Sequence, residues 1–208
     1  MTLKAFHNDP AVKEKYINRV QAHIAADNLI RGIGWDNGKG CAVGCTLEAY
    51  NHSRYPIELG IPEWLARVED TLFEGMSVEK SRTWPLKFLD AIKVGADLEK
   101  IKPLFLVMVL ESALETFDHE EFPDVKNAIQ GSIDLWKRND IGSQDFLDAA
   151  RAAARAAAWA AARAAVRAEA AAAAWAEAWS AARSAAAWSA AKYDYFADEL
   201  LKMLKDCK

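Results

Sequence analysis

Cysteine is scarce in this chain of 208 residues. Only Cys41, Cys45 and Cys207 are present, and an odd number of cysteines provides no framework of paired disulfide bridges. Small secreted domains depend on such a framework, whereas a chain of this length buries roughly 70% of its unfolded surface without one. We therefore expect a reduced, cytoplasmic protein whose fold needs no disulfide, metal or cofactor.

Long apolar segments are missing as well. The most apolar run, residues 101–110, includes Lys102 and Pro103. It is much shorter than the roughly 20 residues that a membrane-spanning helix needs. The first ten residues also lack the basic start and the apolar stretch of a signal peptide. The sequence therefore predicts neither a membrane span nor export.

A strong excess of one charge is missing too. The chain has 26 Lys and Arg against 30 Asp and Glu, which gives a formal net charge of -4. Proteins that coat nucleic acids or anionic membranes are usually basic, so we expect neither a nucleic-acid polymer nor a membrane as the partner. A local basic stripe in the C-terminal region either binds phosphate or an acidic partner, or keeps its helix hydrated. This stripe consists of Arg151, Arg155, Arg163 and Arg167.

Glycine and proline are missing after residue 142. All 10 glycines and all 6 prolines lie before that point, and residues 149–191 are mostly alanine. We expect a helical region 1–142 with a glycine-rich loop and an alanine-rich region 143–208, which together form one globular unit. Alanine has the highest helix propensity, but a single straight helix over residues 143–205 would be about 95 Å long. The sequence therefore predicts an alanine-rich helical hairpin packed on the first region, with its turn at residues 167–174.

Helical periodicity dominates the first region. Apolar residues recur at helical spacing over residues 10–30, and no segment alternates with period two. Asp9-Pro10 predicts the start of that helix, and Pro62 and Pro123 predict later helix starts. The predicted fold class is all-α, a compact multi-helix bundle.

Two polar residues interrupt the apolar stripe of the first predicted helix. His23 and Asp27 are four residues apart, so a helix would place them on one face. A carboxylate beside an imidazole raises the pKa of the imidazole and fixes its tautomer. We expect this pair either to take part in ligand binding or to satisfy its own polar groups within the fold.

Residues 31–55, RGIGWDNGKGCAVGCTLEAYNHSRY, hold the most chemically versatile side chains. Residues 31–40 predict a glycine-rich loop and residues 41–50 a short helix. Backbone N–H groups at a helix start, with nearby cations and aromatic rings, would bind an anion such as phosphate and stack on a base. The alternative is that the glycines only permit a tight connection between packed helices. The candidate ligand-binding residues are His23, Trp35, Lys39, Gly40, Cys41, His52, Arg54 and Tyr55.

Complete metal-binding or catalytic motifs are not visible in the sequence. Cys41, Cys45 and His52 would supply three zinc ligands without an evident fourth, and buried cysteines are common in protein cores. An acidic segment at residues 111–121 contains one histidine but not the repeated E-x-x-H pattern of carboxylate metal sites. We therefore expect no metal site and no catalytic residues, and an enzyme is the less favoured class.

Three parts of the chain resemble a known family. They are GKGCAVGCTLEAYNHSRYPIELGIPEWLARVEDTLFEG at residues 38–75, LVMVLESALETFDHE at residues 106–120, and the tail rich in alanine, tryptophan and arginine. This combination is similar to a family of bacterial and phage proteins described as immunity proteins. The resemblance implies that the chain neutralises something harmful, and it brings no catalytic residues with it.

Two functions are compatible with these observations. The chain is either a non-enzymatic binding protein that sequesters a small anionic, nucleotide-like immune signal, or an immunity protein that binds and neutralises a protein toxin. An enzyme that acts on the same small ligand is a weaker third reading. Aromatic and arginine side chains around one pocket would favour the first function, whereas a flat apolar patch with a charged rim would favour the second. A homo-oligomer is compatible with both.

Overall fold

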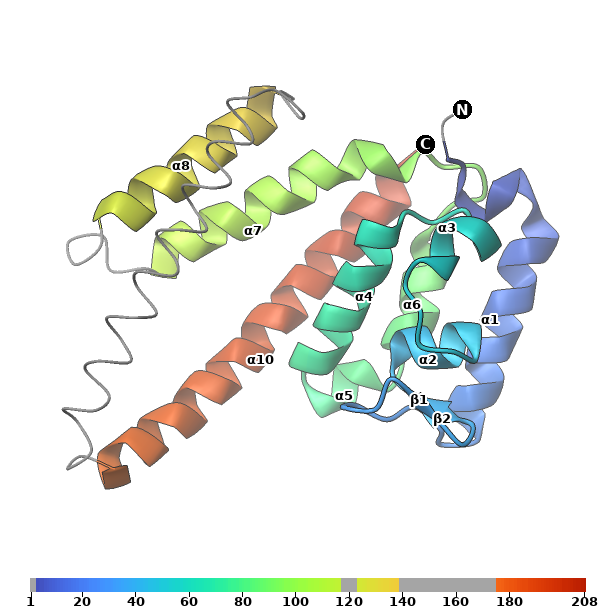
Figure 1. The fold of residues 1–208 in the computed structure, drawn as a ribbon, viewed down its shortest axis with the longest axis horizontal. Helices are drawn as coiled ribbons and strands as arrows, with labels where there is room; N and C mark the ends of the chain where they lie inside the picture. Colours follow the sequence, from blue (N-terminus) through green and yellow to red (C-terminus); the bar gives the residue numbers. More distant parts are fainter. Residues whose placement is uncertain (1–2, 117–122, 139–174) are drawn as a thin grey trace. The chain divides into compact units, whose positions relative to one another are not determined.

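The computed structural model describes residues 3–116, 123–138 and 175–208. Apart from one two-stranded hairpin, the regular elements of these residues are helices, so the predicted all-α class is confirmed (Figure 1). The chain divides into two compact units, residues 1–101 with 185–208 and residues 102–184. The region boundary that the sequence predicts at residue 142 lies outside the described residues.

The first unit contains most of the short helices. Helix α2 is its centre, because it packs against α1, α4 and α6, and all six of its residues are buried. The elements are η1 (Ala5–Asn8), α1 (Pro10–Ala25), β1 (Trp35–Asp36), β2 (Lys39–Gly40), α2 (Ala42–Leu47), α3 (Arg54–Glu58), α4 (Glu63–Gly75), α5 (Val78–Ser81), α6 (Trp84–Ala91) and η2 (Leu98–Ile101). The buried core includes Tyr16, Val20, Tyr55, Leu59, Leu65, Phe73, Phe88 and Ile92.

Several helix starts agree with the sequence. The Asp9 side chain accepts a hydrogen bond of 2.9 Å from the backbone N–H of Ala11, and Pro10 occupies the first helical position. Pro62 directly precedes α4. The end of α1 differs from the prediction: the helix stops at Ala25 rather than at residue 30, because Asp27 adopts a left-handed conformation with a φ of 54°.

Residues 31–40 are more ordered than a loop. Strands β1 and β2 pair in antiparallel register, with Trp35 opposite Gly40, and the two residues between them are Asn37 and Gly38. Their φ values of 48° and 81° are those of a type I′ turn. Asn-Gly is the strongest short-range signal for such a hairpin, so the loop predicted for residues 31–40 is corrected to a hairpin with a two-residue turn.

The hairpin lies so close to α2 that no side chain fits between them. A Cβ on Gly44 would be 1.8 Å from the carbonyl oxygen of Gly34, and a Cβ on Gly40 would be 2.4 Å from the same atom. The backbone N–H of Cys41 donates to the carbonyl of Ile33 at 2.7 Å. These contacts fix the start of α2 to the hairpin.

Helix α10 (Trp175–Asp206) contributes its C-terminal part to the first unit. The ring of Tyr193 lies against Gly75, where a Cβ would be 2.4 Å away, and the Asp194 side chain accepts a 3.0 Å hydrogen bond from the backbone of Ser77. Leu200 and Leu204 are buried. The predicted turn at residues 167–174, the arginine stripe and the alanine helix that carries it lie outside the described residues.

The second unit contains α7 (Lys102–Thr116) and α8 (Pro123–Arg138), which pack against each other. Lys137 on α8 forms a 2.7 Å ion pair with Glu111 on α7. Helix α8 begins at Pro123, as predicted. Across the described residues, no helix is both long and apolar enough to cross a membrane.

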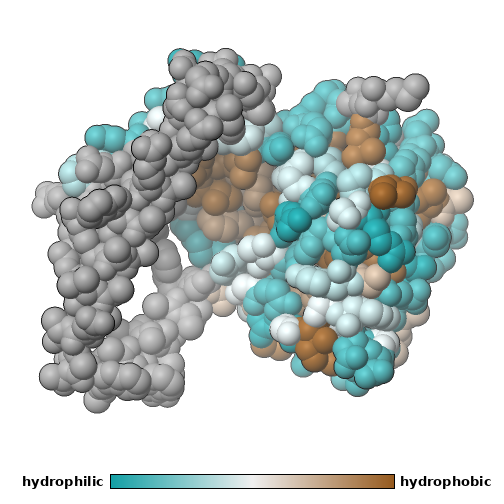
Figure 2. All heavy atoms as spheres, viewed as in Figure 1, coloured by the Kyte–Doolittle hydropathy of each residue, from teal (hydrophilic) through white to brown (hydrophobic). Residues whose placement is uncertain are grey.

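The viewed face of the first unit is largely polar. Figure 2 shows hydrophilic residues over much of the viewed face of the first unit, with small hydrophobic spots among them. Among the described residues, the large apolar side chains with the greatest exposure are Ile33, Tyr50, Ile57, Val78, Leu104 and Tyr195.

The close contact between Gly34 and α2 gives a stability prediction. Gly44→Ala should lower the free energy of unfolding by about 1–3 kcal/mol, because the added methyl group overpacks the hairpin. Gly131→Ala is the matched control, since Gly131 lies inside α8 and a Cβ there would meet nothing within 4 Å. It should raise stability by up to about 1 kcal/mol through helix propensity. Urea denaturation measures both values, and equal stabilisation by the two substitutions would contradict the packing described.

Candidate functional site

The polar cluster of the first unit is built around Asp70 on α4. Asp70 is only 8% exposed. Its Oδ2 accepts hydrogen bonds from the hydroxyl of Tyr50 at 2.9 Å and from Nε2 of His52 at 3.0 Å. Its Oδ1 is buried and has no hydrogen-bond partner among the described residues. Such a buried, unpaired carboxylate oxygen is costly, so this arrangement needs an explanation.

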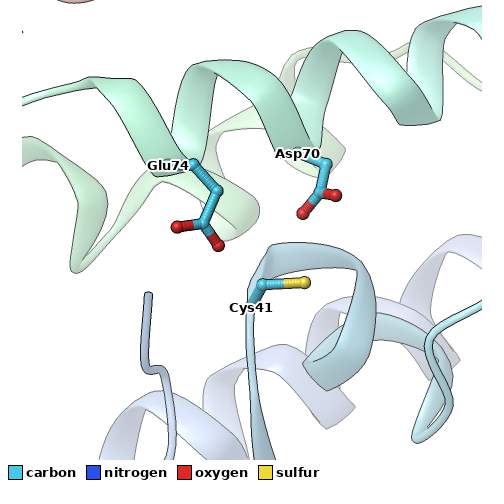
Figure 3. Close-up of side chains that lie close together, drawn as sticks. All are labelled: Cys41, Asp70 and Glu74. Atoms are coloured by element: carbon cyan, nitrogen blue, oxygen red, sulfur yellow. The ribbon is translucent and has the colours of Figure 1, made fainter. Parts of the chain in front are cut away.

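Cys41 and Glu74 complete the cluster. Glu74 lies one helical turn after Asp70 on α4, and Cys41 is the N-cap residue of α2. Potential ligand atoms of Cys41, Asp70 and Glu74 all lie within 4.8 Å of one another (Figure 3). Glu74 is exposed, and its Oε2 accepts a 2.8 Å hydrogen bond from the backbone N–H of Gly32. Two rigid helices and the hairpin therefore place a thiol and two carboxylates around one point.

The protonation of this cluster follows from burial. Burial, with the adjacent Asp70 carboxylate, raises the pKa of the Cys41 thiol well above its usual range. Burial also raises the pKa of Glu74. The hydrogen bond to Asp70 raises the pKa of Tyr50 to about 12. Cys41 is consequently a thiol at neutral pH, which argues against a role as a catalytic nucleophile.

A second carboxyl group lies beneath the cluster. Glu69 is fully buried, and its Oε2 accepts a 2.6 Å hydrogen bond from the hydroxyl of Tyr55, while its Oε1 has no partner among the described residues. Burial raises the pKa of Glu69 to about 8, and the charge of Asp70 adds to this effect. Glu69 is therefore predominantly protonated at neutral pH.

Arg54, a predicted anion ligand, is already paired. Its Nε donates to Oε1 of Glu58 at 2.5 Å, and the hydroxyl of Tyr16 donates to Oε2 of the same carboxylate at 2.5 Å. The arginine charge is thus paired within α3, and the hydrogen bond from Tyr16 to Glu58 links α3 to α1.

His23 belongs to a different group of side chains. Its Nε2 lies 3.6 Å from Oε1 of Glu48, and its ring meets that of Trp35 edge-on at 5.4 Å. Arg19 also pairs with Glu48, at 3.5 Å. The predicted pairing of His23 with Asp27 is therefore wrong, because α1 ends before Asp27 and turns that residue outward, where it is exposed.

The predicted ligand residues are thus spread over several environments. Cys41 and His52 lie in the Asp70 cluster, and His23 contacts Glu48 and the ring of Trp35. Arg54 is bound to Glu58, and Tyr55 is bound to Glu69. Gly40 packs on the carbonyl of Gly34, and Lys39 is exposed on β2.

Sequence reasoning missed Asp70, Glu74, Glu48 and the buried Glu69, and it considered Tyr50 only as one of several aromatic residues in the segment 31–55. A signal for the carboxylates was present, because Glu69 lies four residues from both Leu65 and Phe73 and so falls within the apolar stripe of α4. A carboxylate at a core position marks either a paired structural group or a functional site.

Comparison with known proteins finds no relative from which a function could be inferred. No protein-family model, no curated protein and no solved structure matches the chain.

The buried Glu69 gives a pH prediction. The folded protein binds a proton at Glu69 up to a pKa of about 8, whereas the ordinary value is 4.5. This contribution to stability is complete below pH 4.5 and is lost as the pH rises to about 8. Between these values the free energy of unfolding of wild type should fall relative to that of Glu69→Gln by about 1.4 kcal/mol per pH unit. Urea denaturation from pH 5 to 9 tests this, and parallel pH profiles would refute it.

Proposed function

We propose that the chain is a non-enzymatic binding protein that neutralises a protein partner through the surface around Tyr50. The partner class follows the resemblance of residues 38–75 and 106–120 to immunity proteins, for which a toxin is the natural target. We place this activity in the cytoplasm, because Cys41, Cys45 and Cys207 are all unpaired.

The conformation of Tyr50 is the observation that carries the proposal. Its side chain is 54% exposed, yet its hydroxyl is bound to Asp70. Its ring also rests on the backbone of Gly34, where a Cβ would be 2.5 Å from Cγ of the tyrosine. An exposed aromatic ring that is already held in one conformation loses little entropy on binding, and tyrosine is enriched among interface hot spots.

The surroundings of Tyr50 favour a basic partner with an apolar contact. Ile33, next to Gly34, is 42% exposed, and the carboxylates of Asp36 and Glu74 are exposed on the hairpin and on α4. Apolar side chains with a charged rim are the usual composition of a protein interface, and acidic groups steer a basic partner toward it. The net charge of -4 acts in the same direction.

The same contacts speak against an anion at the Asp70 cluster. Three predicted donors already bind carboxylates of the chain itself: the Gly32 N–H binds Glu74, His52 binds Asp70, and Arg54 binds Glu58. An incoming phosphate would have to displace these carboxylates and would also meet their negative charge.

A small anionic ligand remains the second candidate, at another place. Trp35 is partly exposed beside His23, and the nearby cation of Arg19 shares Glu48 with that histidine. Lys39 is exposed and forms no ion pair within the described part of the chain. An aromatic ring next to cations would stack on a nucleobase and hold a phosphate.

The two candidates make different predictions for single substitutions. Tyr50→Ala should weaken affinity for the captured protein partner by about 30-fold or more, the loss typical of a hot spot. Tyr50→Phe should cause a smaller loss, because the ring remains while its bond to Asp70 is removed. Ile57→Ala is the control, since Ile57 is 75% exposed on α3 and lies outside the cluster, and it should leave affinity unchanged.

The assay is affinity capture from cells that encode candidate toxins, followed by binding measurements with each variant. Native mass spectrometry of the product distinguishes a complex with a partner from a homo-oligomer. Calorimetry with cyclic and linear nucleotides runs in parallel. Binding of a nucleotide that Trp35→Ala abolishes, with no protein captured, would reject the protein-neutralising function, and a partner affinity that Tyr50→Ala does not change would reject the surface around Tyr50 as its site.

A further inference from the structure

We propose that Cys41, Asp70 and Glu74 form a binding site for a divalent transition-metal ion of the zinc class, with one coordination position left to water or a ligand. This proposal concerns the isolated chain and does not depend on the partner proposed above.

The donor set has the right chemistry for such an ion. One sulfur and two carboxylate oxygens are typical zinc ligands, and the thiolate favours zinc, cobalt or ferrous ions over magnesium or calcium. Three protein ligands and an open position are also the pattern of exchangeable zinc sites, as opposed to closed structural sites. Cys41 at the start of α2 lies 29 residues before Asp70 on α4, and Glu74 follows Asp70 by four residues, so the three ligands form no compact sequence motif.

The spacing of the ligand atoms fits after a small adjustment. The three atoms lie within 4.8 Å of one another. Two ligands of a tetrahedral zinc ion, with bonds of about 2.0–2.3 Å, lie about 3.5 Å apart. Glu74 is exposed and has a long side chain, so a small torsional adjustment that keeps its bond to Gly32 closes the remaining gap.

The unpaired oxygen of Asp70 is an independent sign of a missing ligand. Tyr50 and His52 both donate to Oδ2, whereas Oδ1 is buried without a partner among the described residues. Figure 3 shows the Asp70 carboxylate and the Cys41 sulfur turned toward the same space, with Glu74 one helical turn along α4. Hydrogen bonds that fix one oxygen of a carboxylate while the other binds metal are the usual arrangement around metal ligands.

Glu74 repeats this arrangement. Its Oε2 accepts the N–H of Gly32, which leaves Oε1 for an ion. A purely structural account, in which the Cys41 thiol donates to the carbonyl of Gly34 at 3.5 Å, explains the position of the sulfur. The Cys41 thiol also hydrogen-bonds to the Asp70 carboxylate. A bound cation would replace that thiol proton between the sulfur and the carboxylate and would pair with the buried Oδ1.

Cys45 is excluded from the set and provides the control. The zinc ligands that the sequence would supply in this segment are Cys41, Cys45 and His52. Cys45 instead donates to the carbonyl of Gly40 at 3.4 Å, and His52 binds Oδ2 of Asp70. His52 is therefore a positioning residue for Asp70 in this proposal.

The experiment is a cobalt(II) titration of the purified full chain after removal of metal with a chelator. We expect one equivalent to bind and to produce the near-ultraviolet absorption of a thiolate–cobalt bond. Cys41→Ser should abolish that absorption, and Cys45→Ser should retain it. His52→Ala should lower cobalt affinity by about 10- to 100-fold, the usual effect of losing a residue that orients a ligand.

Zinc competition and circular dichroism complete the test. Zinc should displace cobalt and remove the absorption, and circular dichroism should show each variant folded. If Cys41→Ser does not fold, Glu74→Gln decides, because its exposed side chain can change without disturbing the core; it should weaken cobalt binding at least tenfold. Absence of cobalt binding by the wild type, equal absorption in folded Cys41→Ser, or unchanged affinity in Glu74→Gln would overturn the proposal.

Discussion

The carbonyl oxygen of Gly34 and helix α2 are packed so closely that no side chain fits between them, and the arrangement of the polar cluster depends on this contact. It requires glycine at positions 40 and 44, and it fixes Cys41 at the start of α2. Tyr50 rests on the other side of the same backbone. Gly34, Gly40 and Gly44 therefore permit a tight connection between packed elements, which was the alternative to an anion-binding loop.

The second constraint is the burial of two neighbouring carboxyl groups in α4. Glu69 and Asp70 each have one oxygen bound to donors and one buried oxygen without a partner among the described residues. Burying such groups opposes folding, and proteins retain this cost mainly at functional positions. In this chain the buried carboxylate of Asp70 holds Tyr50 in a fixed, exposed conformation and directs one of its oxygens toward Cys41. Partner binding and metal binding are two separate uses of that arrangement.

The sequence was sufficient for the fold class and for many helix starts, because proline, N-cap residues and apolar periodicity act locally. It was not sufficient for the site. Residues such as Arg54 and His52 have the right chemistry for an anion, but the fold gives them carboxylate partners, Glu58 and Asp70, that no spacing rule identifies. His23 was paired with Asp27 because a longer helix was assumed. The left-handed conformation of Asp27 ends the helix early, and no residue next to Asp27 predicts that conformation. The partner of His23 is therefore Glu48.

The central claim is that the carboxylate of Asp70 is retained for function and not for stability. The most direct test is the free energy of unfolding of Asp70→Asn at neutral pH, measured by urea denaturation. Asparagine keeps an acceptor for Tyr50 and His52 and removes the buried negative charge, so we expect a value within about 1 kcal/mol of wild type or above it. A loss of 3 kcal/mol or more, the range expected for breaking an essential buried network, would contradict the claim.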